Sequence, residues 1–267
     1  MASPHRNSLT SGYSFELDTF QVQAFDCIDA GESVLVAAPT GSGKTVVAEY
    51  AIGLARKMGK RAFYTAPIKA LSNQKFHELV KLYGANEVGL LTGDNSINPN
   101  ASIVVMTTEV LRNMIYARSQ ALESLGVVVL DEVHFLQDAY RGPVWEEVII
   151  HLEPTVQLVC LSATVSNASE LCDWLTTVRG PTIPIVETKR PIELTNHYLV
   201  GDKASNSIRT FDVLVDGRAN PEVARFEQSK TNTPIRHSGR QQSRPFGAPQ
   251  RLFAPQRSEI IKELAAA

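Results

Sequence analysis

The stretch from Ser33 to Thr45, SVLVAAPTGSGKT, constrains this chain more than any other feature. An apolar run ends in a glycine-bearing turn, and a lysine and a threonine then open a predicted helix. The spacing matches a phosphate-binding loop, with Ala38 in the position of the first glycine. Free N–H groups at a helix start can surround a phosphate chain, and the helix dipole favours the anion. The stretch therefore predicts nucleotide binding.

Each polar residue of this loop has a predicted role. Lys44 is expected to reach the terminal phosphates of the nucleotide, and Thr45 is expected to hold a magnesium ion. The alternative is a Gly-Ser turn with a chance lysine. The residues predicted to bind the nucleotide here are Pro39, Thr40, Gly41, Ser42, Gly43, Lys44 and Thr45.

Length and composition indicate a globular protein. The chain has 267 residues, 43% of them hydrophobic, which is enough for a substantial core. We expect a cytoplasmic protein with no membrane contact, because neither a signal peptide nor an apolar stretch of membrane-spanning length is present. Three cysteines without CxxC spacing favour reduced, buried thiols (Cys27, Cys160 and Cys172).

Charge is distributed unevenly along the chain. The tract 228–257 has six basic residues and no acid, so it carries +6 and the remainder −8 of the net −2. Its prolines, glutamines and serines lack apolar periodicity, which predicts an irregular basic tail. The tract could hold nucleic acid through phosphates, or it could be a solvated linker without a partner.

Apolar strands and amphipathic helices alternate through about residue 187, which predicts a parallel sheet with helices on both faces. Predicted strands are 34–36, 61–66, 88–91, 103–107, 127–130 and 157–161, and predicted helices include 15–28, 71–83 and 109–116. Asn167 and Glu170 are expected to form a capping box. In such sheets, ligands bind at the carboxyl ends of the strands.

Asp131, Glu132, Val133 and His134 follow the most apolar predicted strand. They should lie at the same sheet edge as Lys44. Behind a phosphate loop, the first acid there helps to hold magnesium and a neighbouring acid can activate water. We therefore expect Asp131 to be the metal partner and Glu132 the general base, with His134 as part of the same catalytic group. Without a phosphate loop in the same chain, an Asp-Glu pair after a strand would be interpreted as the solvent-exposed start of a helix.

The order of these segments resembles the first RecA-like domain of a superfamily-two helicase, a fold of the P-loop NTPase class. The segments are APTGSGKT, PIKALSNQK (67–75), TGD (92–94), TTE (107–109), DEVH and SAT (162–164). The segment RGPVWEEVII (141–150) is similar to the superkiller-like DEVH-box branch, whose members include exosome-associated RNA helicases and actinobacterial relatives.

The resemblance implies further site residues. Phe15 and Gln21 match the adenine-recognition element, and without the family they are ordinary packing residues. The motifs that touch the nucleic-acid backbone are matched by Pro67, Lys69, Thr92, Gly93, Asp94, Thr108 and Glu109. Ser162, Ala163 and Thr164 match the segment that couples hydrolysis to strand separation.

The resemblance also implies a domain organisation. Residues 1–12 are expected to be a flexible N-terminus, 13–200 the ATP-binding RecA-like domain, 201–256 a mobile linker or insertion, and 257–267 the start of a truncated second RecA-like domain. The implied activity is that of an ATP- and Mg²⁺-dependent helicase on single-stranded or tailed nucleic acid, with RNA favoured. This chain is expected to be a fragment that lacks the second domain.

Two other interpretations stay open. One is a nucleotide-dependent module that binds nucleic acid or protein without turnover. The other is a different phosphate-loop machine such as a transporter ATPase, against which the DEVH and SAT segments and the lack of an LSGGQ signature argue.

Overall fold

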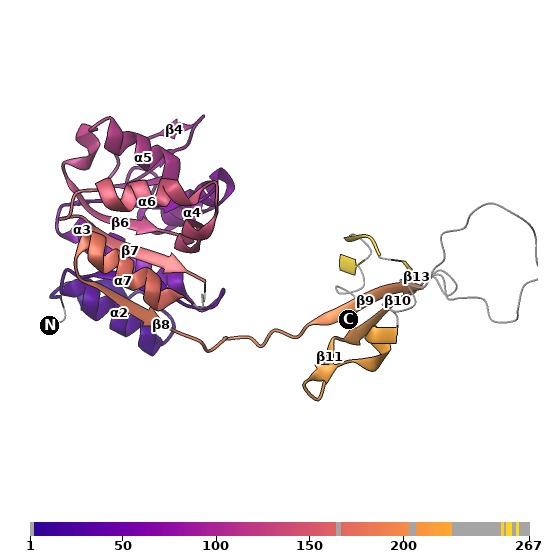
Figure 1. The fold of residues 1–267 in the computed structure, drawn as a ribbon. Helices are drawn as coiled ribbons and strands as arrows, with labels where there is room; N and C mark the ends of the chain where they lie inside the picture. The colour runs from indigo at the N-terminus through magenta and orange to yellow at the C-terminus, as the bar shows by residue number, and fades with distance from the viewer. Residues whose placement is uncertain are drawn as a thin grey trace, which may run out of the picture. The chain divides into compact units, whose positions relative to one another are not determined.

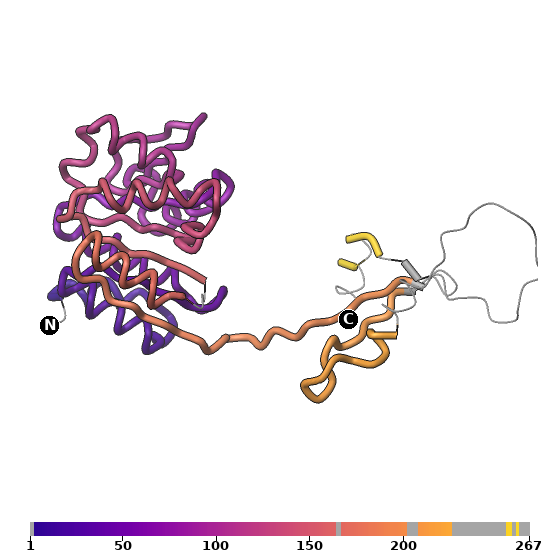
Figure 2. The backbone as a smooth tube through the Cα atoms, viewed as in Figure 1, coloured from indigo at the N-terminus to yellow at the C-terminus, as the bar shows by residue number. Residues whose placement is uncertain are grey.

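The computed structural model describes residues 3–163, 167–202, 207–225, 252–253, 255–257 and 260–261. The chain divides into two compact units, Met1–Pro191 and Ile192–Ala267. The backbone tube passes from the first unit to the second through residues 187–196, which have no regular secondary structure (Figure 2).

The first unit is built on an eight-stranded sheet in the order β4-β3-β5-β2-β6-β7-β1-β8. All neighbouring pairs are parallel except β3 and β4. The strands are β1 (Ser33–Ala37), β2 (Arg61–Ala66), β3 (Val88–Leu91), β4 (Ser96–Ile97), β5 (Ile103–Thr107), β6 (Leu125–Leu130), β7 (Gln157–Ser162) and β8 (Thr182–Val186). The predicted α/β fold with a mostly parallel sheet is confirmed.

Helices cover both faces of this sheet (Figure 1). They are α1 (Arg6–Thr10), α2 (Thr19–Asp29), α3 (Lys44–Lys57), α4 (Lys69–Tyr83), α5 (Thr108–Tyr116), α6 (Gly142–His151) and α7 (Ala168–Arg179), with short 3₁₀ turns η1 (Gln120–Leu122) and η2 (Val133–Gln137). Continuous apolar runs such as VVVL in β6 are needed because the central strands are buried on both sides.

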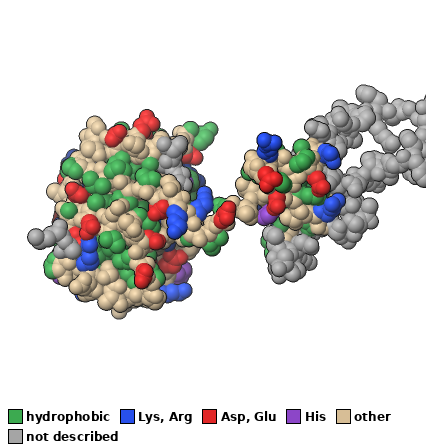
Figure 3. All heavy atoms as spheres, turned by 90° about the horizontal axis from the view of Figure 1, so that it is seen from below, with side chains coloured by type: hydrophobic (Ala, Val, Ile, Leu, Met, Phe, Trp, Pro, Cys, Tyr) green, Lys and Arg blue, Asp and Glu red, His purple; other side chains and the backbone are tan. Residues whose placement is uncertain are grey.

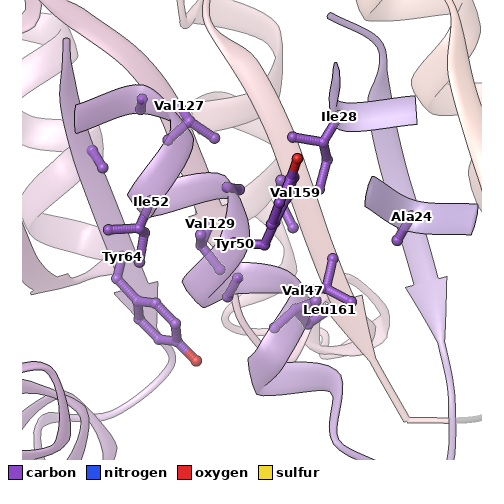
Figure 4. Close-up of a cluster of buried hydrophobic side chains, with 14 of the residues drawn as sticks. Ala24, Ile28, Val47, Tyr50, Ile52, Tyr64, Val127, Val129, Val159 and Leu161 are labelled. Carbon is purple, nitrogen blue, oxygen red and sulfur yellow. The ribbon is translucent and has the colours of Figure 1, made fainter. Parts of the chain in front are cut away.

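Alternate residues of each strand enter two separate cores. Val127 and Val129 of β6 join the core formed with α2, α3 and α4, whereas Val128 and Leu130 join the core formed with α5, α6 and α7. The first core includes Val47 and other residues shown in Figure 4. This two-sided packing holds the carboxyl ends of the parallel strands at one sheet edge.

The N-terminal residues differ from the flexible stretch that we expected. Residues Arg6–Thr10 form the short helix α1. The guanidinium of Arg6 lies 2.7 Å from Asp26 Oδ1 and 2.6 Å from Asp29 Oδ2. Leu9 packs against the first core. The sequence pattern does not predict this helix, because its five residues are too few to show a helical period.

Two helix starts also depend on local hydrogen bonds. Helix α2 begins at Thr19, later than predicted, because Asp18 and Gln21 form a capping box in which the Asp18 N–H donates to Gln21 Oε1 at 2.9 Å. The capping box predicted at Asn167 is wrong. Asn167 makes no side-chain cap bond, and its Oδ1 accepts instead from Gln137 Nε2 at 2.9 Å.

The second unit begins earlier than the boundary at residue 200 that we expected. Its strands are β9 (His197–Asp202), β10 (Ser207–Asp212), β11 (Leu214–Val215), β12 (Arg218–Ala219) and β13 (Leu252–Phe253). β10, β9 and β13 form an antiparallel sheet, and β11 and β12 form a hairpin. Residues 201–256, which we expected to be a mobile linker or insertion, thus include the strands β10 to β13. Residues 226–251, which hold most of the basic tail, and most of 257–267 lie outside the described residues.

Acidic and basic side chains are interspersed on the face of the first unit shown in Figure 3. Within the described part of the chain, no helix has the length and apolarity required to cross a membrane. All three cysteines are free thiols, and Cys160 and Cys172 are buried while Cys27 is half-buried.

Candidate nucleotide and nucleic-acid site

The phosphate loop lies where β1 ends and α3 begins. Its first residue is fixed by the neighbouring strand, since the Ala38 N–H donates to the Ser162 carbonyl at 3.2 Å. Strands β2, β5, β6 and β7 run parallel to β1. The segments that follow these strands are therefore brought to the same sheet edge, as the sequence predicts.

Two glycines let the loop turn sharply. Gly41 and Gly43 both have φ +85°, in the left-handed region that other residues rarely adopt. Gly43 is also the N-cap of α3. Lys44 and Thr45 thereby open the first turn of a 14-residue helix, whose free N–H groups can bind an anion.

Lys44 folds back over the loop. Its Nζ donates to the Ala38 carbonyl at 2.6 Å and to the Pro39 carbonyl at 3.0 Å. Burial lowers the pKa of Lys44, while the charges of Glu132 and Asp131 act to raise it. The hydroxyl of Ser42 is buried without a hydrogen-bond partner among the described residues. The loop thus contains a desolvated cation and an unpaired polar group, both of which a phosphate chain would satisfy.

Asp131 is held at the end of β6 by three hydrogen bonds. Its N–H donates to the Thr65 carbonyl at 3.0 Å. Its Oδ2 accepts from the Tyr64 hydroxyl at 2.6 Å, and its Oδ1 accepts from the Glu132 N–H at 2.9 Å. Because both side-chain partners donate, the carboxylate is set up as an acceptor with lone pairs to spare.

Glu132 has an unusual backbone conformation. Its φ is +54°, in the left-handed region, which is uncommon for a residue with a side chain. Such strain costs about 1–3 kcal/mol and clusters at functional sites. Burial raises the pKa of Glu132, and the Asp131 charge raises it further, while His134 and Lys44 oppose these effects. A carboxylate with a raised pKa is a better proton acceptor.

His134 lies beside Glu132. Its Nδ1 is 3.3 Å from Glu132 Oε2, but the geometry is not that of a hydrogen bond, and Nδ1 has no such partner among the described residues. The structure thus brings together Lys44, Asp131, Glu132 and His134, the four predicted catalytic residues.

The donor set near Thr45 fits magnesium. Thr45 opens α3 and Asp131 follows β6, so a hydroxyl oxygen and a carboxylate oxygen are available beside the loop, and Mg²⁺ prefers few protein oxygens with phosphate oxygens completing its shell. No cluster of three or more His, Cys, Asp or Glu suited to a metal is found in the described part of the chain. Lys75 Nζ lies 3.4 Å from Thr45 Oγ1 and 2.7 Å from Glu78 Oε2.

Gln21 joins the loop directly. It is 2% exposed, and its Nε2 donates to the Gly43 carbonyl at 3.1 Å. Phe15 is 51% exposed and stacks on Tyr13 with ring centroids 5.2 Å apart. The structure thus places Gln21 against the phosphate loop and leaves the Phe15 ring accessible to a ligand.

The residues matched to nucleic-acid motifs differ in exposure. Lys69, Gly93 and Asp94 are exposed, Glu109 is half-buried, and Pro67, Thr92 and Thr108 are buried. Lys69 Nζ forms a short ion pair with Asp94, and Asp94 Oδ1 also accepts from Thr92 Oγ1 at 3.1 Å. The exposed residues are therefore available to a strand, whereas the buried ones shape the loops.

The segment expected to couple hydrolysis to strand separation is only partly described. The Ser162 side chain is buried, and its hydroxyl has no hydrogen-bond partner among the described residues. Ala163 is half-buried. Thr164 lies outside the described residues.

Two residues near the site were missed by the sequence argument. Lys75 is the last residue of the PIKALSNQK segment, but nothing in its position along the chain indicates a contact with Thr45. Tyr64 stands in a strand that is buried except for its first residue. A hydroxyl-bearing ring in such a strand was the available signal, since a buried phenol needs a hydrogen-bond partner.

The comparisons agree with this geometry. The sequence model of the family described as DEAD/DEAH box helicase matches residues 18–171. "Probable helicase HelY" of Mycobacterium tuberculosis (strain ATCC 25618 / H37Rv) is 48% identical over 96% of this chain and 29% of its own length. "DExH-box ATP-dependent RNA helicase DExH15 chloroplastic" of Arabidopsis thaliana is 49% identical over 72% of this chain and 17% of its own length. Human "Superkiller complex protein 2" is 47% identical over 77% of this chain and 16% of its own length.

Solved helicase structures have the same fold. The DUF1998 helicase MrfA bound to DNA has a TM-score of 0.58 at 26% identity, covering 69% of this chain and 29% of that one. The helicase Lhr of Mycobacterium smegmatis, bound to ssDNA and AMP-PNP, has a TM-score of 0.55 at 26% identity, covering 68% and 27%. The chain spans less than a third of the length of these curated relatives.

Proposed function

The chain belongs to the DEAD/DEAH box helicase family, and from that membership we propose that it is the ATP-binding half of an ATP-dependent helicase that acts on RNA. The predicted resemblance to DEVH-box helicases of the superkiller-like branch is confirmed, since HelY and human Superkiller complex protein 2 are among its relatives. RNA is favoured because DExH15 is named an RNA helicase.

The observation that carries this proposal is the convergence of Lys44, Thr45, Asp131 and Glu132 at one sheet edge. Lys44 would exchange its bonds to the Ala38 and Pro39 carbonyls for the terminal phosphates of ATP. Thr45 and Asp131 would hold Mg²⁺, which when bound neutralises phosphate charge. Glu132 would orient and deprotonate the attacking water, helped by its raised pKa.

Nucleic acid would cross the same edge of the sheet. Lys69, Gly93 and Asp94 are exposed beyond β2 and β3, and Lys69 can pair with a phosphate when it leaves Asp94. We propose that a second RecA-like domain closes the nucleotide site from the other side and that Ser162, Ala163 and Thr164 transmit the closure. Phe15 would stack on the adenine base, and Gln21 would contact the base after giving up one of its present hydrogen bonds.

Titration of the chain with a fluorescent ATP analogue and Mg²⁺ tests this proposal. Parent protein should bind, and Lys44→Ala should bind more weakly by about 1.5–3 kcal/mol, because a charged hydrogen bond to phosphate is lost. Equal affinity in a folded Lys44→Ala variant would contradict the assignment of the loop.

A binding module without turnover is the rival function. It is separated from a helicase by steady-state phosphate release from a longer protein that includes the second domain, with and without single-stranded RNA or DNA. RNA-stimulated release supports the helicase proposal. Stimulation by DNA alone would contradict the choice of RNA, and nucleotide binding without release would favour the module.

A further inference from the structure

Tyr64 contacts the candidate metal-binding carboxylate from the buried side of the sheet. Its ring is 1% exposed and belongs to the first core. Its hydroxyl donates a 2.6 Å hydrogen bond to Asp131 Oδ2. In Figure 4 the ring lies near Ile52, and the hydroxyl points away from that side chain.

The strand register explains how the two residues meet. Tyr64 of β2 is the direct partner of Val129 in β6. Asp131 lies two residues further along the same chain, and alternate residues of a strand share a face. The ring therefore has to reach along the sheet face by about 6.6 Å, the rise of two strand residues. Tyrosine has this length and ends in a donor.

The hydrogen bond restricts Asp131 to one orientation. Oδ2 is fixed by the phenol and Oδ1 by the Glu132 N–H. In this bond the phenol O–H donates and the carboxylate oxygen accepts. Since partners that orient a ligand strongly affect metal affinity, this bond has a consequence beyond packing.

We propose that Tyr64 is a positioning residue that holds the Asp131 carboxylate in the orientation that binds the Mg²⁺ of Mg-ATP. This inference rests on the proposed function, because it requires a magnesium site at Asp131 and Thr45. Lys75 completes the surroundings, with its Nζ 6.0 Å from the centroid of the Tyr64 ring and 3.4 Å from Thr45 Oγ1.

The test is the Mg²⁺ dependence of fluorescent ATP-analogue binding in parent and Tyr64→Phe protein. The apparent Mg²⁺ affinity of Tyr64→Phe should fall by roughly tenfold or more, while binding in EDTA should be unchanged. A purely structural role would weaken binding with and without Mg²⁺ alike. An unchanged Mg²⁺ affinity, or equal losses in both conditions, would overturn the proposal.

Tyr50→Phe is the matched control. Tyr50 is also 1% exposed, and its hydroxyl donates to Asp29 Oδ1 at 2.5 Å, but Asp29 is not part of the site. This variant loses a phenol–carboxylate bond of the same kind and should keep the parent's Mg²⁺ dependence. A matching loss of Mg²⁺ affinity in Tyr50→Phe would overturn the specific role of Tyr64.

Melting curves and an Asp131→Asn background separate a loss of Mg²⁺ affinity from a loss of folding. Melting curves set a temperature at which parent and both variants are folded. In an Asp131→Asn background, Tyr64→Phe should cause no additional loss of Mg²⁺ affinity, because Tyr64 acts through that carboxylate, and an additive loss would overturn the proposal. If parent protein itself shows no Mg²⁺ dependence, the proposed function fails rather than the role of Tyr64 alone.

Discussion

The side chain of Gln21 donates a 3.1 Å hydrogen bond to the carbonyl of Gly43. Helix α2 is thereby tied to the phosphate loop. The same amide accepts from the Asp18 N–H at 2.9 Å, so both ends of the Gln21 side chain are engaged. A change in the loop at Gly43 must therefore also disturb the start of α2.

This relationship predicts unequal effects of two glycine substitutions. Gly43→Ala should lose about 1–2 kcal/mol of stability for its left-handed backbone, plus a further 1–2 kcal/mol because Gln21 must give up hydrogen bonds. A Cβ at Gly43 would lie 2.7 Å from Gln21 Nε2. Gly41 has the same φ of +85°, but no atom lies within 4 Å of the Cβ that Gly41→Ala would add. Gly41→Ala should therefore lose only the roughly 1–2 kcal/mol of stability that comes from the left-handed backbone.

Urea unfolding of the two variants measures this difference. In a Gln21→Ala background, the free energies of unfolding of Gly43→Ala and Gly41→Ala should lie closer together, because the side chain that obstructs the added Cβ at position 43 is removed. Equal destabilisation by both glycine substitutions would show that the contact with Gln21 has no energetic consequence.

Glu132→Gln should separate nucleotide binding from hydrolysis. The amide keeps the shape and a polar contact but cannot accept the proton of water. In a longer protein with the second domain, we expect Mg-ATP binding close to that of the parent and phosphate release reduced by 10² or more. Turnover at the parent rate would exclude Glu132 as the base.

Much of this site follows from the sequence for a simple reason. Parallel strands begin and end together, so APTGSGKT and DEVH meet at one edge once the apolar runs before them are recognised as strands. Strand β2 was predicted at its observed bounds because every residue in it except the first is buried. The motif spacing similarly led to the helicase family.

Other features depend on contacts that one sequence does not display. The Tyr64–Asp131 and Lys75–Thr45 contacts join residues 67 and 30 positions apart. Strand β4 has only two residues, both exposed, so it carries no apolar pattern. The missing cap at Asn167 reflects competition, because Gln137 takes the side-chain oxygen that the capping box would use.

The pH dependence of stability should differ between two glutamates near Lys75. Burial raises the pKa of Glu49, partly opposed by the Lys75 charge. The unfolded chain therefore releases this proton at lower pH than the folded chain, and stability falls as pH rises through the folded pKa. Glu49→Gln should thus gain stability relative to parent as pH rises from the acid range to neutrality.

Glu78→Gln is the contrasting control. Burial acts to raise the pKa of Glu78, but hydrogen bonds from Lys75 and Gln74 leave it lowered. Its contribution to stability is present above the unfolded pKa and lost as pH falls through the folded pKa, so Glu78→Gln should lose stability at neutral pH. Urea midpoints measured across pH give the stability of each variant relative to the parent. Stability changes of the same sign at neutral pH in Glu49→Gln and Glu78→Gln would contradict the opposite pKa shifts of the two glutamates.

Lys69 and Asp94 should have opposite effects on RNA binding. Lys69→Ala removes a cation that can pair with phosphate, so the salt dependence of single-stranded RNA affinity should decrease by about one unit of slope. Asp94→Asn frees Lys69 from its ion pair and should leave the affinity equal or higher. Salt titrations on a protein that includes the second domain test this, and a loss of affinity in Asp94→Asn would show that Asp94 itself contacts the strand.

The last prediction concerns the γ-phosphate. Phosphoryl transfer spreads charge over its oxygens, and an arginine supplied by a second domain can contribute on the order of 10³ to 10⁵ in rate. Lys44 and the proposed magnesium site would supply only part of the charge needed to neutralise these oxygens. We therefore expect the 267 residues alone to bind ATP weakly, to hydrolyse it very slowly and to leave duplexes intact. RNA should scarcely raise the rate of hydrolysis, because closure over the nucleotide needs a second lobe.

The rate of phosphate release should rise by at least 10³ when the second RecA-like domain is joined to these residues. Robust RNA-stimulated hydrolysis by the 267 residues, lost in Glu132→Gln, would show that this chain supplies the missing charge itself.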